Sequence, residues 1–413
     1  MHRRHVLLHT SLAAAALLGV PALHAQPQPQ PQPQPAWDDT VAKARGQSVF
    51  WNAWAGDEKT NAFIAWVGAQ LKASHGVNLQ HVRLKDTAEA VTRVVAEKAA
   101  GRDRDGSVDL IWINGPNFLA MKQQGLLFGP VTQTLPNFGL VDTTKKRSNV
   151  VDFSTPVDGM AVPWRLAQLV LVYDSARIRT AAEMPRSAPA MLDWARKHPG
   201  RLTHPNVSNF LGASFLKQAL IDLVADPQLL QQAATDANFD ATAAPLWAWY
   251  DAIKPMLWRQ GRQFPENGAA QLQLLSDGEI DITLSFDPSE AAVSVDAGAL
   301  PATVRTTGWA KGSIGNTSFV AIPYNAKNKE GALVVANFLI APATQARAQD
   351  IRHMGSLNVL NADKLSAAQR RLFAQLSDHP SLPSAAELGR PQLEPHATWM
   401  TRITAAWQKR YTR

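Results

Sequence analysis

Apolar and polar residues follow one another in a repeating strand, loop and helix pattern at the start of the folded part. Val49, Phe50 and Trp51 are apolar and β-prone, which predicts a short buried strand, and the polar stretch 52–57 ends it. From Thr60 onward apolar residues recur at helical spacing. The order repeats with strands expected over 77–84 and 108–113, each followed by a helix. This repetition is typical of a parallel sheet with covering helices.

The later pattern predicts that the chain leaves this first sheet and then returns to it. The run 160–173 is extended and leads into a second region, in which helices are expected over 190–197, 210–224 and 247–259 and a strand over 281–286. The segment 303–309 leads back, and a strand over 318–322 and a helix over 331–340 follow. We therefore expect an α/β protein with two lobes, each a mainly parallel sheet flanked by helices, joined by a two-segment hinge.

The beginning of the chain predicts export. A basic start with Arg3 and Arg4 and a short apolar run indicate a signal peptide over 1–25. A disordered spacer rich in Pro and Gln is expected over 26–45. The first lobe is then expected over 46–158 and the second over 159–303, and 304–413 is expected to return to the first lobe and to end in helices.

Composition excludes several classes of site. The chain has no cysteine, which excludes disulfides, thiolate chemistry and a lipid-modified cysteine, so we expect a soluble periplasmic protein that is not a lipoprotein. The formal net charge of +7 is scattered along the chain, so no nucleic-acid partner is expected. The histidines show no ligand-type clustering and are expected at the surface, and we expect no metal, no cofactor and a monomer.

Candidate ligand-binding residues lie in polar loops after the expected strands and at the two crossings. In open α/β sheets ligands bind outside the carboxyl ends of the strands, where such loops meet helix N-termini. The candidates are Trp54, Asp57, Asn114, Asn117, Trp164, Arg165, Asn206, Ser208, Asn209, Asp287, Glu290, Trp309 and Asn316. Two of these loops have a second interpretation: Trp54 is a tryptophan packed under its own loop, and 114–117 is an ordinary turn.

These candidates leave the ligand chemistry open. Tryptophan faces with carboxylates suit an organic cation, and the same faces would stack against a sugar ring. Arg165 and the helix starts near Asn206 and Asn316 suit an anion instead.

The sequence gives little support to an enzyme, and we expect none. It contains no Gly-x-Ser-x-Gly, no phosphate loop and no His-Glu-x-x-His. Ser214 and Lys217 match Ser-x-x-Lys, the start of a penicillin-binding-protein site, but neither 276–278 nor 311–313 supplies a fitting partner motif. A secreted serine hydrolase that uses this pair is the first alternative, and a carbohydrate-binding module is the second.

Four segments carry a family resemblance: Val49–Asp57, Asp86–Gly101, Val108–Phe128 and Gly315–Asn325. With them the chain resembles an extracellular solute-binding protein (family 1) of bacterial ABC importers, in particular the YnjB-like group. The resemblance implies a two-lobed type II periplasmic-binding-protein fold. It also implies that a small polar solute binds between the lobes and is delivered to an inner-membrane permease and its ATPase.

The resemblance also bears on the ligand. Iron binders of this family use adjacent tyrosines, whereas the four tyrosines of this chain are isolated in sequence, which disfavours ferric iron. A thiamine-like or polyamine-like organic cation is the favoured solute.

Overall fold

The computed structural model describes residues 37–180, 182–376 and 378–412. The expected signal peptide and the Pro/Gln run lie outside the described residues. The spacer prediction is wrong for its last part, because Trp37–Ala44 forms a helix, α1. Asp38 and Asp39 lie in its first turn, where carboxylates favour a helix, and α1 packs against α10 (Lys329–Leu339).

The first sheet confirms the predicted strand, loop and helix repeat. The strands β1 (Ser48–Trp54), β2 (Asn78–Leu84) and β3 (Leu110–Ile113) are parallel, with β1 in the middle and β2 at the edge. The helices between and after them are α2 (Glu58–His75), α3 (Ala88–Ala99) and α4 (Gly115–Gln123). β1 is longer than expected and ends at Trp54, because Asn52 is buried and pairs with both neighbouring strands.

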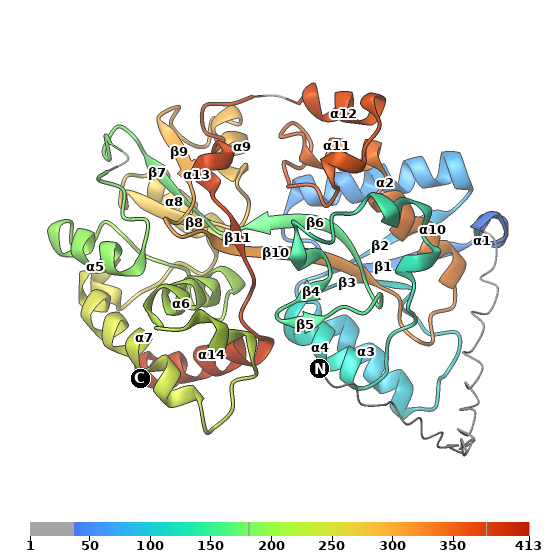
Figure 1. The fold of residues 1–413 in the computed structure, drawn as a ribbon, viewed down its shortest axis with the longest axis horizontal. Helices are drawn as coiled ribbons and strands as arrows, with labels where there is room; N and C mark the ends of the chain where they lie inside the picture. The colour runs from blue at the N-terminus through green and yellow to red at the C-terminus, as the bar shows by residue number, and fades with distance from the viewer. Residues whose placement is uncertain (1–36, 181, 377, 413) are drawn as a thin grey trace, which may run out of the picture. The chain divides into compact units, whose positions relative to one another are not determined.

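Two long strands connect the first sheet to the rest of the molecule. β6 (Val162–Gln168) and β10 (Ser313–Ala321) are antiparallel, and the second half of β10 also pairs with β3. The beginning of β10 pairs with the short β11 (Pro391–Gln392). Figure 1 shows β6 and β10 running between the two groups of helices. We call the part built on β1, β2 and β3 the first lobe.

The second lobe is built on a different kind of sheet. β7 (Val170–Asp174) lies between β8 (Ile282–Ser285) and β9 (Val304–Thr307), and both pairings are antiparallel. The sequence predicts a mainly parallel sheet here, so this prediction is corrected. β7 continues β6 into the lobe whereas β9 leads out of it, so the two must run in opposite directions. As a result the carboxyl ends of β8 and β9 lie toward the first lobe.

Helices cover both lobes, and the return segment is divided between them. The helices of the second lobe are α5 (Ala188–Lys197), α6 (Phe210–Leu223), α7 (Phe239–Ile253), α8 (Gly268–Ser276), α9 (Glu290–Asp296), α13 (Ala385–Leu388) and α14 (Ala397–Tyr411). The first lobe also contains α11 (Pro342–Gln349) and α12 (Ala367–Ala374). In addition to the two predicted hinge segments, a third segment of the chain passes from the first lobe to the second. Phe373 packs on the core of the first lobe, whereas His379 lies 3.4 Å from Asp296 of α9 in the second lobe.

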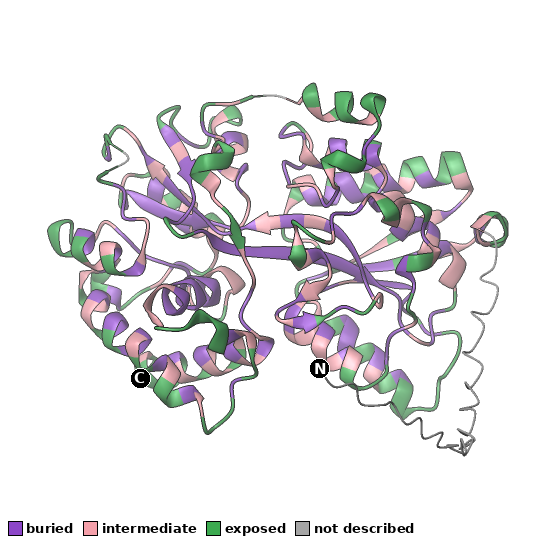
Figure 2. Ribbon diagram, viewed as in Figure 1, coloured by how far each residue is buried: buried purple, intermediate pink, exposed green. Residues whose placement is uncertain are grey.

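The largest buried side chains form separate cores in the two lobes. Figure 2 shows buried residues concentrated on the strands and on the inner faces of the helices. Trp399, Ile403 and Trp407 of α14 lie in the core of the second lobe. The prediction that 304–413 returns to the first lobe is therefore wrong for this helix. In the described part of the chain no helix is long and apolar enough to span a bilayer.

The surface prediction for histidines is wrong for His204. Its ring is fully buried, and Nε2 lies 2.8 Å from the Tyr250 hydroxyl while Nδ1 lies 2.7 Å from the Pro205 carbonyl oxygen. Burial lowers the pKa of His204 to about 4, so the ring is neutral at pH 7. His204 is therefore a hydrogen-bonded core residue.

Candidate functional site

The carboxyl ends of β1 and β8 bring carboxyl groups from both lobes near one another, and an arginine is paired with one of them. Asp57 follows β1, and Asp287 and Glu290 follow β8. Arg165 of β6 donates from Nη2 to Asp287 Oδ2 at 2.9 Å. Asp57 is close enough for its charge to act on both Asp287 and Glu290. With Trp54 and Trp112 these residues form what we call the aromatic–acidic cluster.

Two tryptophans form the aromatic part of this cluster. Trp54 is 39% exposed, and its ring meets that of Trp112 edge-on with 6.2 Å between the ring centroids. The Arg165 guanidinium carbon lies 6.0 Å from the Trp112 ring centroid. The Trp54 ring folds over Gly56, where an added Cβ would lie 2.2 Å from Trp54 Cζ2. The Trp54 side chain is thus partly exposed, and the position of its ring depends on the absence of a side chain at Gly56.

Trp112 was not among the predicted site residues. It alternates with the buried residues Ile111 and Ile113 in β3, so its side chain projects from the opposite face of the sheet. This period-two position, two residues before the polar Asn114, is the signal that could have identified it.

Local hydrogen bonds fix two of the carboxylates. Asp57 caps α2 and accepts from the Thr60 amide at 2.8 Å and from the Thr60 hydroxyl at 2.5 Å. Asp287 accepts from the Ser289 amide at 3.2 Å and from its hydroxyl at 3.0 Å. Since a cap and a turn hold these carboxylates, they are positioned in advance of any ligand.

The cluster carries more negative than positive charge. Burial raises the pKa of Asp287, which Arg165 opposes. Burial also raises the pKa of Glu290 to about 7, and the charges of Asp287 and Asp57 add to the rise. Three carboxyl groups therefore interact with one another while one guanidinium pairs with Asp287, and a bound cation would relieve the repulsion among them.

Two predicted ligand contacts are core residues instead. Trp164 and Trp309 are 0% and 1% exposed. Trp164 lies against Trp112 at 4.9 Å and Trp51 at 5.5 Å between ring centroids, and Trp309 belongs to the core of the second lobe. Trp164 lies on β6 itself and is buried by rings from β1, α2 and β3, and Trp309 is buried in the core of the second lobe.

Asn114 and Asn316 come together through a side-chain hydrogen bond. Asn114 Nδ2 donates to Asn316 Oδ1 at 3.0 Å, and Asn316 Nδ2 donates to Glu394 Oε1 at 3.3 Å. Glu394 in turn accepts from Lys217 Nζ at 2.6 Å. The two asparagines thus belong to a polar network with Lys217, which the sequence indicated only as part of Ser-x-x-Lys, and with Glu394, which it did not indicate. Asn117 lies in the first turn of α4 and is half-buried.

This network also bears on the Ser-x-x-Lys motif. Ser214 and Lys217 are fully buried, and Ser214 Oγ has no hydrogen-bond partner among the described residues. The Lys217 ammonium is paired with Glu394 and is not bonded to Ser214. A nucleophile needs both a bonded base and access to substrate, and the geometry supplies neither.

The polar loop before α6 mainly satisfies its own backbone. Asn206 Oδ1 accepts from the Ser208 amide at 3.0 Å, and Asn209 Oδ1 caps the helix by accepting from the Leu211 amide at 3.0 Å. The next residue, Phe210, lies 5.1 Å from Phe286 between ring centroids, which brings this helix start beside the residue that precedes Asp287.

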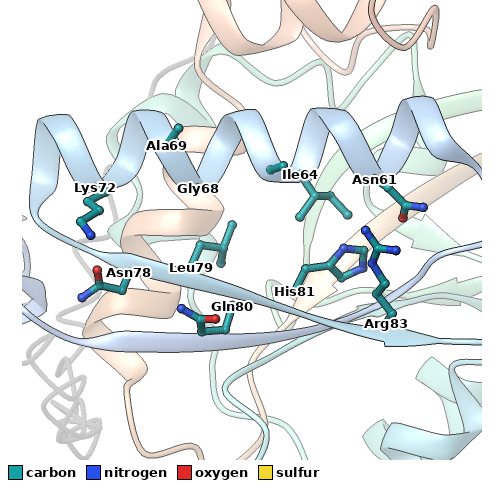
Figure 3. Close-up of a pocket in the computed structure, with 11 residues that line it drawn as sticks. Asn61, Ile64, Gly68, Ala69, Lys72, Asn78, Leu79, Gln80, His81 and Arg83 are labelled. Atoms are coloured by element: carbon teal, nitrogen blue, oxygen red, sulfur yellow. The ribbon is translucent and has the colours of Figure 1, made fainter.

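A groove of about 410 Å³ lies elsewhere, along the outer edge of the first sheet between α2 and β2 (Figure 3). Lys72, His81 and Arg83 are among its lining residues, and none of the predicted site residues is. The described residues contain no group of three or more His, Asp or Glu side chains placed to hold a metal ion.

The comparisons identify the family. The family model for bacterial extracellular solute-binding proteins matches residues 66–361, and the chain belongs to this family. Protein YnjB of Escherichia coli strain K12 is 39% identical over 375 residues, which cover 91% of this chain and 94% of YnjB. The family and the YnjB-like group predicted from the sequence are therefore confirmed.

Solved structures agree on the fold. The Tp0655 (TpPotD) lipoprotein of Treponema pallidum has a TM-score of 0.63 at 14% identity, with 89% of this chain and 100% of that one covered. The periplasmic binding protein AfuA of Actinobacillus pleuropneumoniae, with exogenous fructose-6-phosphate bound, has a TM-score of 0.59 at 12% identity and covers 89% and 99%. The two-lobed type II periplasmic-binding-protein fold is thus confirmed.

Proposed function

We propose that this protein is the periplasmic solute-binding component of an ABC importer, which captures a small organic cation at the aromatic–acidic cluster. It delivers that solute to an inner-membrane permease and its ATPase, as a soluble monomer without a lipid anchor. The observation that carries the proposal is the grouping of carboxyl groups from two lobes: Arg165 is paired with Asp287, Asp57 and Glu290 lie near enough for their charges to interact with Asp287, and Trp54 is exposed beside them. The two lobes contribute Asp57 and Asp287 respectively, so a cation held there is attracted by carboxylates of both lobes.

The chemistry of the cluster favours a cation over an anion or a sugar. A cation over a tryptophan face gains about 0.5–2 kcal/mol, and more when it is desolvated. An anion would meet three carboxylates, and the one arginine is already paired with Asp287. A thiamine-like or polyamine-like cation fits this combination of an aromatic face and several carboxylates.

The function is tested by identifying what the protein carries. We expect mass spectrometry of molecules released from protein purified from the periplasm to show an organic cation. In a thermal-shift series, thiamine, spermidine or putrescine should stabilise the protein, by about 2.7 kcal/mol at a hundredfold excess over Kd. Stabilisation by fructose-6-phosphate or a neutral sugar, without any effect of the cations, would contradict the proposal.

Trp54→Ala should weaken the affinity for the cation by about 1–3 kcal/mol and change the melting temperature of the solute-free protein little. The melting temperature should change little because the Trp54 side chain is already 39% exposed. Calorimetry on wild type, Trp54→Ala and Trp258→Ala measures this; Trp258 is a half-buried tryptophan of the second lobe bonded to Glu279 and serves as control.

A second substitution tests the position of the ring without removing it. Gly56→Ala places a methyl group against Trp54 and should also weaken binding, because the ring must move. Equal affinity in wild type, Trp54→Ala and Gly56→Ala would show that the tryptophan is not part of the site.

Cation affinity should depend on pH through Glu290. Burial and the neighbouring carboxylates raise the pKa of Glu290 to about 7, so the side chain is neutral below pH 7 and ionised above it. A cation binds the ionised form better, so affinity should fall as the pH drops below 7, by at most about tenfold per pH unit, and level off above it. Glu290→Gln should remove this dependence, as calorimetry between pH 5.5 and 8.5 would show.

The solute-free protein should show the opposite trend in stability. With a pKa raised above its unfolded value of 4.5, Glu290 binds its proton more tightly in the folded state. Its contribution therefore lowers the free energy of unfolding as pH rises from 4.5 to 7. If wild type and Glu290→Gln share the same pH profiles, Glu290 does not titrate in this range.

A further inference from the structure

The short hairpin formed by β4 (Val151–Asp152) and β5 (Thr155–Pro156) has an unfavourable turn sequence. Its two turn residues, Phe153 and Ser154, have φ of 45° and 62°. Two-residue turns with positive φ at both positions favour Asn-Gly, because a side chain with a Cβ is strained there. Contacts elsewhere must therefore keep Phe and Ser in this conformation.

Those contacts are made with the second lobe. The hairpin belongs to the first lobe, where Asp152 accepts from the Gly115 amide of α4 at 2.6 Å. Ser154 Oγ lies 2.8 Å from Gln231 Oε1 and 2.9 Å from the Glu394 carbonyl oxygen. The ring of Phe153 is buried with its centroid 6.4 Å from that of Phe210 in α6.

The ammonium of Lys217 lies at the centre of these contacts. It is 4.6 Å from the Phe153 ring centroid, 5.0 Å from that of Phe210 and 2.6 Å from Glu394 Oε2. The side chains of Lys217 and Glu394 are 0% and 3% exposed. The two aromatic rings and the carboxylate thus surround one buried cation that touches groups of both lobes.

A hydrogen-bond chain continues from this ammonium into the first lobe. Lys217 of α6 bonds Glu394, Glu394 accepts from Asn316 of β10, and Asn316 accepts from Asn114 at the start of α4, over 2.6, 3.3 and 3.0 Å. The chain passes through the strand that connects the lobes. It therefore links α6 of the second lobe to α4 of the first without a break.

We propose that the tip of the β4–β5 hairpin, which packs against α6 and the Lys217 ammonium, sets how readily the lobes come together for solute capture. The proposal rests on the proposed function for its biological meaning. Separation of the lobes removes the Phe153 and Ser154 contacts, so these contacts favour the arrangement with the lobes together. Apparent affinity is reduced by the fraction of molecules outside the binding-competent arrangement, so loss of these contacts lowers affinity.

The double substitution Phe153→Asn with Ser154→Gly tests this. Asn-Gly favours the turn itself and removes the contacts with Phe210, Lys217, Gln231 and Glu394. Because the chain has no cysteine, spin labels can be attached at Thr92→Cys in α3 and Ala248→Cys in α7, both exposed. In solute-free protein we expect the distance distribution to shift to longer values, with the ratio of close to separated lobes on the order of tenfold lower.

Asp105→Gly is the matched control. Asp105 is an exposed first-lobe residue with φ of 54°, so glycine relieves the same kind of strain without an interlobe contact. If the double variant fails to fold, Ser154→Ala decides, with a smaller shift in the same direction expected. An unchanged distance distribution in a folded variant would overturn the proposal. Because no solute is used, this result is independent of whether an organic cation binds.

Discussion

Replacing Trp164 with alanine should lower the free energy of unfolding by about 3–5 kcal/mol, the usual cost of removing a large aromatic core side chain. Trp164 is 0% exposed and joins three other rings: Phe63 at 6.2 Å, Trp51 at 5.5 Å and Trp112 at 4.9 Å between centroids. Its Nε1 has no hydrogen-bond partner among the described residues, so the loss is one of packing.

Urea unfolding of Trp164→Ala, Trp164→Phe and Trp54→Ala measures this effect. The phenylalanine variant should lose less, because a smaller ring leaves a smaller cavity. Trp54→Ala is the exposed control and should change stability far less. A cost below about 1 kcal/mol for Trp164→Ala would mean that the residue is not packed as the structure shows. Since Trp164 supports Trp112, the alanine variant should also weaken solute binding.

Replacing Lys217 with methionine should be similarly destabilising, by about 3–5 kcal/mol, because it leaves the Glu394 carboxylate buried without a counter-ion. Burial raises the pKa of Glu394, and Lys217 opposes this. Without Lys217 the carboxyl group can become neutral only by taking up a proton. The cost of Lys217→Met should therefore be smaller at pH 5 than at pH 8.

The double variant Lys217→Met/Glu394→Leu shows whether the cost of Lys217→Met comes from the unpaired Glu394 charge or from the loss of the ion pair itself. Well-packed apolar side chains often replace a buried ion pair at little cost, so the double variant should recover most of the stability lost by Lys217→Met alone. Chemical denaturation at both pH values completes the cycle. Additive costs in the double variant would show that Lys217 and Glu394 are not coupled.

The sequence alone was sufficient for the features that depend on neighbours in the chain. The first sheet follows from apolar runs and helical spacing, and Gly76 ends α2 in the left-handed conformation that glycine favours. The placement of Asp57 and Asp287 directly after buried strands also follows from the local pattern. Residues in this position are candidates for a ligand site, because ligands bind outside the carboxyl ends of strands. These are short-range effects, and the residues that carry them are close in sequence.

Only the tertiary structure decided which tryptophan is exposed at the candidate site and which is buried in the core. Trp54, Trp112 and Trp164 have similar local settings, but Trp164 is buried where β6 packs on rings of β1, α2 and β3, whereas Trp54 stays exposed. The antiparallel second sheet depends on the direction in which β7 enters the lobe, which no local pattern records. The Lys217–Glu394 pair joins residues 177 positions apart, and a buried charge can be anticipated only when its partner is known. Burial and charge pairing are decided by contacts distant in sequence, and for this reason the fold was more predictable than the site.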